Sequence, residues 1–261
     1  MNYVRLFGVY LRVNALGELA YRVNFYVQLF ETIVELATAL AGLAVIFTYT
    51  DNLHGWTPDE MLVLVGIYFM AGGIIGLVIE PSLEQFITSV RDGTLDFTLT
   101  RPEDSQLLAS IQTVNIWKLI DIVMGLAVLG TALIRLGEKI GAWGAASFGL
   151  MSLAGLVIIY SFWLVLATLS FWFVRVENIL VIFQSMYEAG RWPISLYPGW
   201  LRFALTFVVP IAFATTVPAE ALTGRLTPST LLGALALAVA LAALSRIFWR
   251  IGLQHYSGAS A

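Results

Sequence analysis

Four charged residues stand inside stretches that are otherwise apolar, and they are the first candidates for chemistry: Glu31, Glu35, Lys118 and Asp121. Glu31 and Glu35 are four residues apart, which places both carboxylates on one face of a helix. Lys118 and Asp121 are three apart, so they can pair on one helix face. Because an unpaired charge is costly in apolar surroundings, the two glutamates must face protein or water. They either line a hydrophilic path for a solute or pair structurally with a base such as Lys118 or Arg175.

The familiar motifs for catalysis and cofactor binding are absent. A P-loop needs a Gly-Lys pair, and neither Lys118 nor Lys139 follows a glycine. The chain has no cysteine, which excludes a thiolate nucleophile and a cysteine-based metal site. His54 and His255 lie in polar stretches near opposite ends of the chain, without other metal ligands beside them. We therefore expect no catalytic residue, no metal site and no cofactor held by this chain.

The amino-acid composition indicates which environment surrounds the helices that carry these charged residues. Of 261 residues, 59% are hydrophobic and only 12% are charged, with a mean hydropathy of +0.84. A soluble fold of this length could not bury so much apolar surface, so the sequence predicts a protein of the lipid bilayer. The net charge of −3 gives no indication of a nucleic-acid partner.

Uncharged or nearly uncharged stretches of about 20 residues predict membrane-spanning helices. Six are expected, in chain order: Asn24–Thr48, Met61–Ile79, Gln112–Leu136, Ala145–Phe173, a short one at Val176–Ala189, and Leu226–Ser245. The first 22 residues mix arginines with apolar residues and lack the apolar core of a signal peptide. We expect them to form an amphipathic helix on the membrane surface.

The segment from Pro198 to Gly224 is interrupted by prolines and is the hardest to assign. Pro198, Pro210 and Pro218 favour two short helices that enter the membrane and return on the same side. The alternative is a full span at Trp200–Leu222, which would raise the number of spans to seven. The fold expected for residues 1–261 is thus a single all-α, polytopic membrane domain with six transmembrane helices. It carries an interfacial helix at 1–22 and a re-entrant hairpin at 198–224, before the last span.

The distribution of Lys and Arg predicts that both termini are cytoplasmic. With six spans, nine basic residues fall on the side of the N-terminus: Arg5, Arg12, Arg22, Arg91, Arg101, Lys118, Arg175, Arg246 and Arg250. Five fall on the other side: Arg135, Lys139, Arg191, Arg202 and Arg225.

The longest polar stretch, residues 80–105, lies on the predicted cytoplasmic side. Pro81 can begin a short helix, and Arg91-Asp92-Gly93 would end it with a glycine cap. A short helix with charged and apolar residues at its tip suits docking onto another protein. A plain solvated connector is the alternative.

Two sequence patterns resemble those of ABC-2 type transporter permeases. VRDGTLDFTLTRP, residues 90–102, is similar to the I-x-x-G-x-L-D-x-x-L-x-x-P pattern of that superfamily's inner loop. AGRWPISLYPGWLRFALTFVVPIAF, residues 189–213, is similar to its late segment, where a re-entrant hairpin precedes the last span. The residues in these two patterns resemble those of a bacterial subfamily of previously uncharacterised ABC-2 permeases. The resemblance extends over essentially the whole chain.

This resemblance implies a permease subunit, not an enzyme, located in the bacterial inner membrane. Such a chain forms a pore with a second permease, identical or homologous, and is energised by two separate ABC ATPase subunits that bind ATP and Mg²⁺. Export is the more common direction in the family. The resemblance places Glu31 and Glu35 along the translocation path or at the seam between the permeases. The residues expected to couple the chain to the ATPase are Phe86, Arg91, Asp92, Gly93, Leu95, Asp96 and Phe97.

Two other classes of function stay open at this point. A membrane scaffold or assembly factor would transport nothing. An ion-coupled secondary transporter would use the intramembrane acids as ion sites, although no inverted repeat is apparent in the sequence.

Overall fold

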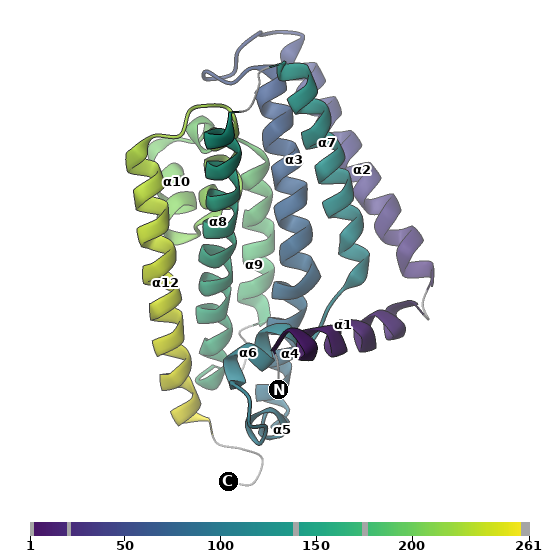
Figure 1. The fold of residues 1–261 in the computed structure, drawn as a ribbon, viewed down its shortest axis with the longest axis vertical. Coiled ribbons are helices and arrows are strands. Elements are labelled where there is room, and N and C mark those ends of the chain that lie inside the picture. The colour runs from purple at the N-terminus through teal and green to yellow at the C-terminus, as the bar shows by residue number, and fades with distance from the viewer. Residues whose placement is uncertain (1–2, 20–21, 138–140, 174–176, 257–261) are drawn as a thin grey trace.

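The computed structural model describes residues 3–19, 22–137, 141–173 and 177–256. Within these ranges the chain folds into helices joined by short loops, and no β-strand is formed. Five helical segments are long and apolar enough to cross a membrane: Val23–Phe47, Pro58–Arg91, Ile116–Leu136, Ala142–Phe171 and Pro228–His255. They run side by side along the long axis of the molecule (Figure 1). The predicted all-α, polytopic architecture is confirmed.

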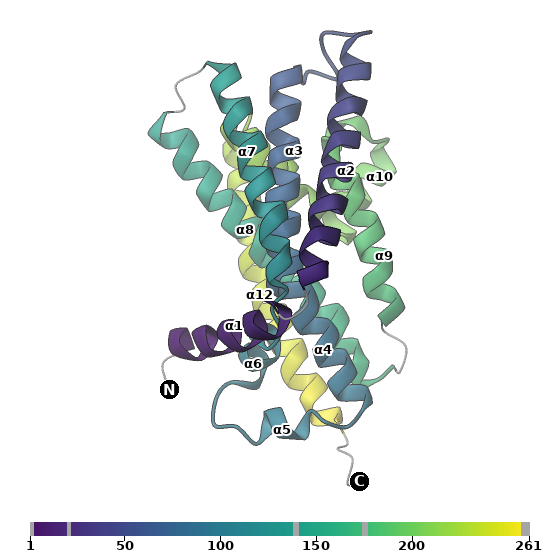
Figure 2. The same cartoon turned by 90° about the vertical axis from the view of Figure 1, so that its right-hand side faces the viewer.

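The five long segments are built from six α-helices. They are α2 (Arg22–Phe47), α3 (Pro58–Ile74) continued by α4 (Glu80–Arg91), α7 (Leu119–Leu136), α8 (Ala142–Thr168) and α12 (Pro228–His255). The remaining predicted span corresponds to α9 (Glu177–Tyr187), which has only 11 residues. It packs against α8 and lies at the edge of the bundle in Figure 2, where Val181 and Ile182 are exposed. A short helix can cross part of a bilayer where neighbouring helices cover it.

The segment from Pro198 to Gly224 is broken, as its prolines predict. α10 (Gly199–Phe203) and the π-helical turn after it meet Ile211–Leu222, which includes α11 (Thr216–Leu222), at an angle of 74°. Pro210 stands at the break. Figures 1 and 2 place α10 in the half of the bundle away from both termini. A bend of this size occurs in re-entrant hairpins and in broken spans, and the re-entrant arrangement stays a prediction.

The second span is longer than the sequence indicates, because the expected break at Pro81 does not occur. α3 and α4 form one helical segment through a π-helical turn at Ile75–Ile79. Pro81 has no N–H to donate to the Leu77 carbonyl, and the Asn115 N–H takes its place at 2.9 Å. The predicted short helix is present as α4, with Pro81 in its first turn, but it continues from α3 without an intervening loop. The proline is tolerated because another segment satisfies the freed carbonyl.

α1 (Tyr3–Leu19) lies across the direction of the long helices, near the end of the molecule that carries both termini (Figure 2). It is fixed to the segment that follows α5 (Asp96–Leu99) and includes α6 (Ser105–Ile111). The Arg101 guanidinium bonds to the Tyr10 hydroxyl. The Trp117 indole donates to Glu18 at 2.7 Å. The exposed residues of α1 include Arg12 and five apolar side chains: Val9, Leu11, Val13, Leu16 and Leu19.

The same polar segment is also tied to the last helix. Arg246 of α12 donates to the Asp104 carboxylate and, at 2.8 Å, to the Gln106 side-chain oxygen. The hydrogen bonds from Arg246 hold the pKa of Asp104 below its usual value. Residues 101–117 are thus held by polar contacts to both α1 and α12, the first and the last helix of the chain.

Small residues permit the closest helix contacts. A Cβ atom on Gly66 of α3 would lie 2.9 Å from the Gly125 carbonyl oxygen of α7, and one on Gly125 would lie 2.7 Å from that of Gly66. A Cβ on Gly155 of α8 would lie 2.1 Å from the Phe213 carbonyl oxygen. These glycines bring backbones into direct contact, as is common in membrane helix packing.

Candidate functional site

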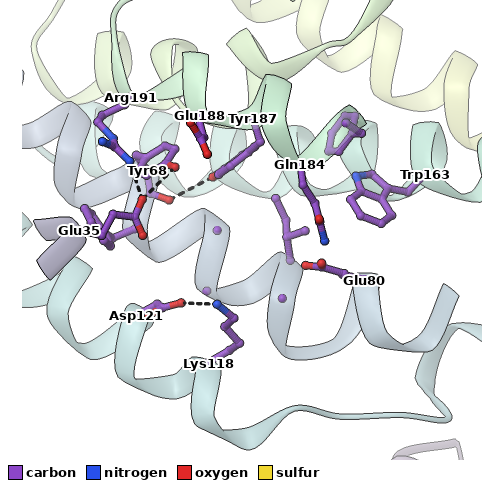
Figure 3. Close-up of a pocket in the computed structure, with 16 residues that line it drawn as sticks. Glu35, Tyr68, Glu80, Lys118, Asp121, Trp163, Gln184, Tyr187, Glu188 and Arg191 are labelled. Carbon is purple, nitrogen blue, oxygen red and sulfur yellow. Dashed lines mark hydrogen bonds and ion pairs between the residues drawn. The ribbon is translucent and has the colours of Figure 1, made fainter. Parts of the chain in front are cut away.

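A polar cavity of about 410 Å³, open to the outside along part of its surface, is formed by α2, α3, α4, α7, α8, α9 and the short helical turns that adjoin them. Figure 3 shows acidic, basic and aromatic side chains converging on it from these helices and from the turn that follows α9. Its polar lining consists of Glu35, Tyr68, Glu80, Lys118, Asp121, Gln184, Tyr187, Glu188 and Arg191. A cavity of this size is within the usual range for small-molecule sites, and its lining is far more polar than a lipid-facing surface.

Three glycines on one wall make room for these side chains. A Cβ on Gly72 would lie 3.2 Å from the Tyr187 ring, and a Cβ on Gly76 would lie 3.1 Å from the Lys118 side chain. A Cβ on Gly73 would lie 2.6 Å from Ile122. The AGGIIG run at residues 71–76 therefore positions the site, a role that sequence reasoning missed because the run looks like ordinary span composition.

Glu35 anchors one end of the cavity through an ion pair. Its carboxylate lies 2.6 Å from the Arg191 guanidinium and accepts a hydrogen bond of 3.3 Å from the Tyr68 hydroxyl. The guanidinium carbon lies 5.3 Å from the centre of the Tyr68 ring, which adds a cation–π contact. Tyr187 stacks on Tyr68 with ring centres 5.0 Å apart and donates to the Tyr68 carbonyl. This arrangement fixes the rings and the charges together.

The partner of Glu35 differs from both candidates that the sequence offered. Arg175 lies outside the described residues, and Lys118 pairs elsewhere. Arg191 was assigned to a loop on the side away from the N-terminus, so spacing alone could not connect it to Glu35. Only the turn at the end of α9 brings the two together.

The predicted pair of Lys118 and Asp121 is confirmed, with 3.2 Å between the ammonium nitrogen and the carboxylate oxygen. Asp121 also accepts hydrogen bonds from Thr32 and, at 3.2 Å, from Gln28, both on α2. The carboxylate thus joins α2 to α7 beside the cavity. Its charge is neutralised within the chain.

Glu31 and Glu35 do not act as one site, although they share a helix. Glu31 is exposed on α2 and has no hydrogen-bond or ion-pair partner among the described residues. The outer face of α2 around it is apolar, with Tyr26, Phe30 and Ile33 exposed. Only Glu35 lines the cavity.

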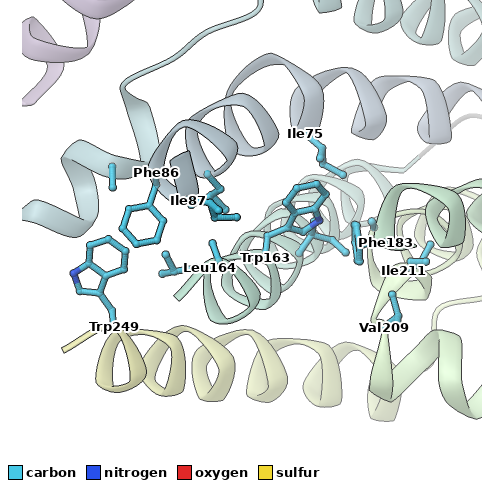
Figure 4. Packing of buried hydrophobic residues seen from close by; sticks show 14 of the residues in the cluster. Ile75, Phe86, Ile87, Trp163, Leu164, Phe183, Val209, Ile211 and Trp249 are labelled. Carbon is cyan, nitrogen blue, oxygen red and sulfur yellow. The ribbon is translucent and has the colours of Figure 1, made fainter. Parts of the chain in front are cut away.

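Phe86 and Leu95, two of the predicted coupling residues, are 0% and 1% exposed. They belong to a hydrophobic core with Trp163 and Trp249, and the rings of Phe86 and Trp249 are 4.8 Å apart (Figure 4). Side chains buried in this way present no surface to another subunit in this structure, and a coupling role for these two stays a prediction.

The remaining coupling candidates lie at the end of the molecule near both termini (Figure 2). Arg91 and Asp92 are exposed and form an ion pair of 3.1 Å. Gly93 has φ of +70°, which confirms the predicted glycine at the end of the helix. Asp96 is half-buried, whereas Phe97 is 75% exposed. An exposed phenylalanine beside charged residues is suited to a protein contact.

Comparison with known proteins is consistent with this arrangement of a multi-pass bundle around a polar cavity. A search of curated proteins and a search of solved structures gave no match. The family model described as "ABC-2 family transporter protein" matches residues 33–260, which is most of the chain. This chain is a multi-pass membrane protein that belongs to the ABC-2 family of transporter proteins.

Proposed function

We propose that this chain is the pore-forming permease subunit of an ATP-driven exporter in a bacterial inner membrane. The observation that carries the proposal is the polar cavity inside an apolar bundle, in a chain that belongs to a transporter family. Polar and charged groups at such a depth are costly, and a solute path is their usual reason. The chain itself contributes no catalytic group, and ATP and Mg²⁺ are bound by the partner ATPase.

The cavity contributes a preformed polar compartment for a solute. The pairs Glu35–Arg191 and Lys118–Asp121 keep four of its charges neutral within the bundle, so the protein does not depend on a solute to stabilise them. The ring stack of Tyr68 and Tyr187 covers the first pair. Movement of α9 or α2 would widen this compartment, because the Glu35–Arg191 pair joins α2 to the turn after α9 and the hydrogen bonds of Asp121 join α7 to α2.

A second permease, identical or homologous, completes the pore in this proposal. The outer face of α2 supports it, since Glu31 stands there among exposed apolar residues. A carboxylate facing lipid would be unfavourable, and a partner subunit would supply a polar surrounding. The polar contact at the subunit seam is thus assigned to Glu31, and the solute path to Glu35.

Two ATPase subunits would dock at the end of the molecule that holds α1, α5 and both termini, which is the cytoplasmic side in this proposal. Arg91, Asp92 and Phe97 supply charged and apolar contacts there. Residues 101–117 would transmit the movement, because they are bonded to α1 and to α12.

The test is reconstitution of a complete transporter. The chain is co-expressed with the ABC ATPase subunits of the same organism, purified, and placed in lipid vesicles. We expect the ATPase to co-purify and its hydrolysis rate to differ from that of the ATPase alone. A scaffold would bind without changing hydrolysis, and failure of every ATPase to associate would contradict the proposal.

A further inference from the structure

The carboxylates that line the cavity outnumber the bases. Glu35 is neutralised by Arg191 and Asp121 by Lys118. Glu80 and Glu188 also line the cavity, and neither has an ion-pair or hydrogen-bond partner among the residues that the structure describes. Figure 3 shows them in different parts of the cavity, Glu80 near Gln184 and Glu188 beside Tyr187. When ionised, they leave the compartment with a surplus of negative charge.

An independent feature of the same cavity indicates a missing ligand. The side chain of Trp163 is 1% exposed, yet its indole nitrogen has no hydrogen-bond partner in the described structure. The indole lies at the end of the cavity that holds Gln184 and Glu80 (Figure 3). A buried N–H without an acceptor is unfavourable. The nitrogen itself is fully buried in the cavity wall, so a small shift of the Trp163 side chain would let an acceptor atom on a ligand remove this cost.

The walls between these polar groups are aromatic. Tyr68 and Tyr187 stack on one side, and Trp163 meets Phe183 edge to face with ring centres 4.9 Å apart on the other. Aromatic faces attract cations as well as apolar groups. An anionic solute would face two unpaired carboxylates, and a neutral polar solute would leave both of them without a counter-charge.

We propose that the cavity binds a hydrophobic organic cation that also carries a hydrogen-bond acceptor. The cationic group would lie in the negative electrostatic field of Glu80 and Glu188, the apolar part against the aromatic walls, and the acceptor near the Trp163 indole. The cavity volume of about 410 Å³ suits a molecule of this class. That such a cation is the transported substrate rests on the proposed function. That the cavity binds the cation depends on this chain alone.

The experiment measures binding to the full-length chain in phosphatidylcholine nanodiscs by isothermal titration calorimetry. The probes are procaine, a protonated tertiary amine with an aromatic ester, and ethyl 4-aminobenzoate, which has the same aromatic ester without the alkylammonium group. Empty nanodiscs give the background of partitioning into lipid. We expect saturable binding of procaine at least about tenfold tighter than binding of the neutral ester.

Matched variants place the effect in the cavity. Glu80→Gln and Glu188→Gln keep size and shape, and each should weaken procaine binding about tenfold without changing binding of the neutral ester. Glu103→Gln, in the loop outside the cavity, should leave both unchanged. Size-exclusion profiles check that the variants fold, and the comparison of the two probes on the unmodified chain needs no variant.

Equal binding of the two probes, no binding of either, or unchanged procaine binding in both cavity variants would overturn the inference. These outcomes are distinct from failure of the proposed function. An ATPase-coupled transporter that does not discriminate procaine from its neutral analogue would refute the cation site alone. Selective procaine binding in a chain that associates with no ATPase would refute the proposed function alone.

Discussion

Neighbouring residues in the loop after α4 have different roles: one packs in the core and another is exposed for contact with a partner. Leu95 is 1% exposed and Phe97 is 75% exposed, although they are two residues apart. Leu95→Asp would bury a carboxylate in the hydrophobic core and should destabilise the fold by more than about 3 kcal/mol. Phe97→Asp should leave the melting temperature nearly unchanged and abolish co-purification of the ATPase. Thermal unfolding and co-purification are measured on both variants.

The two outcomes can contradict the assignment independently. If Phe97→Asp retains full ATPase association, the surface around α5 is not the coupling surface. If Leu95→Asp is as stable as the parent protein, the burial of Leu95 in the hydrophobic core is wrong.

At the same scale, the ion pair of Glu35 and Arg191 should stabilise the fold, whereas Glu31 should not. Glu35→Gln leaves the Arg191 guanidinium without its counter-charge, and since both side chains are partly exposed we expect a loss of about 1–2 kcal/mol. Glu31→Gln is the matched control on the same helix. The double variant Glu35→Gln/Arg191→Gln should recover part of the loss, and thermal unfolding of the four proteins measures it. Equal melting temperatures for Glu35→Gln and Glu31→Gln would show that the ion pair of Glu35 and Arg191 does not stabilise the fold.

Residue roles were predictable from sequence only where the partner is near in the chain. The pair of Lys118 and Asp121 is one helical turn apart and was predicted, as was the glycine cap at Gly93. Arg191 is 156 residues from Glu35, and no local pattern connects them. The burial of Phe86 and Leu95 could not be predicted, because an apolar residue in a polar loop is equally consistent with a docking surface and with a core.

At the scale of elements, the contact of the broken segment with α8 depends on the absence of a side chain at Gly155. Gly155→Ala would place a Cβ 2.1 Å from the Phe213 carbonyl oxygen, so the two backbones must separate. We expect a loss of about 1–3 kcal/mol in the free energy of unfolding. Gly149→Ala, on the same helix with nothing within 4 Å, should be neutral or slightly stabilising. Thermal unfolding compares the two variants, and an equal effect would contradict the close contact.

The positions of the long helices could be predicted from hydropathy, whereas the connections between the helices could not. Uncharged stretches located α3, α8 and α12, because an apolar helix is the simplest structure that satisfies its own backbone in lipid. The join between α3 and α4 could not be predicted. It depends on the Asn115 N–H reaching the Leu77 carbonyl across 38 residues, a tertiary contact that overrides the usual effect of Pro81.

At the scale of the whole molecule, composition predicted the bilayer as solvent and a bundle of about six spans. The cavity could not be predicted from composition, because six α-helices and three short helical turns contribute to it. The sequence indicated that charges inside spans need partners or water. It could not indicate that Glu80, Gln184 and Glu188 would meet them in one compartment.

The topology of the broken segment is the property of the whole molecule that is most directly testable, since the natural chain has no cysteine. Gly199→Cys precedes the break and Ser229→Cys follows the segment, and both positions are exposed. A re-entrant hairpin places them on one side of the membrane, so we expect an impermeant maleimide to label both on intact cells. Glu103→Cys, in the loop proposed to be cytoplasmic, should react only after permeabilisation. If Trp200–Leu222 were a full span, one of these two cysteines would be protected from the maleimide until the cells are permeabilised. If both cysteines were labelled only after permeabilisation, the hairpin would stand but would lie on the cytoplasmic side of the membrane.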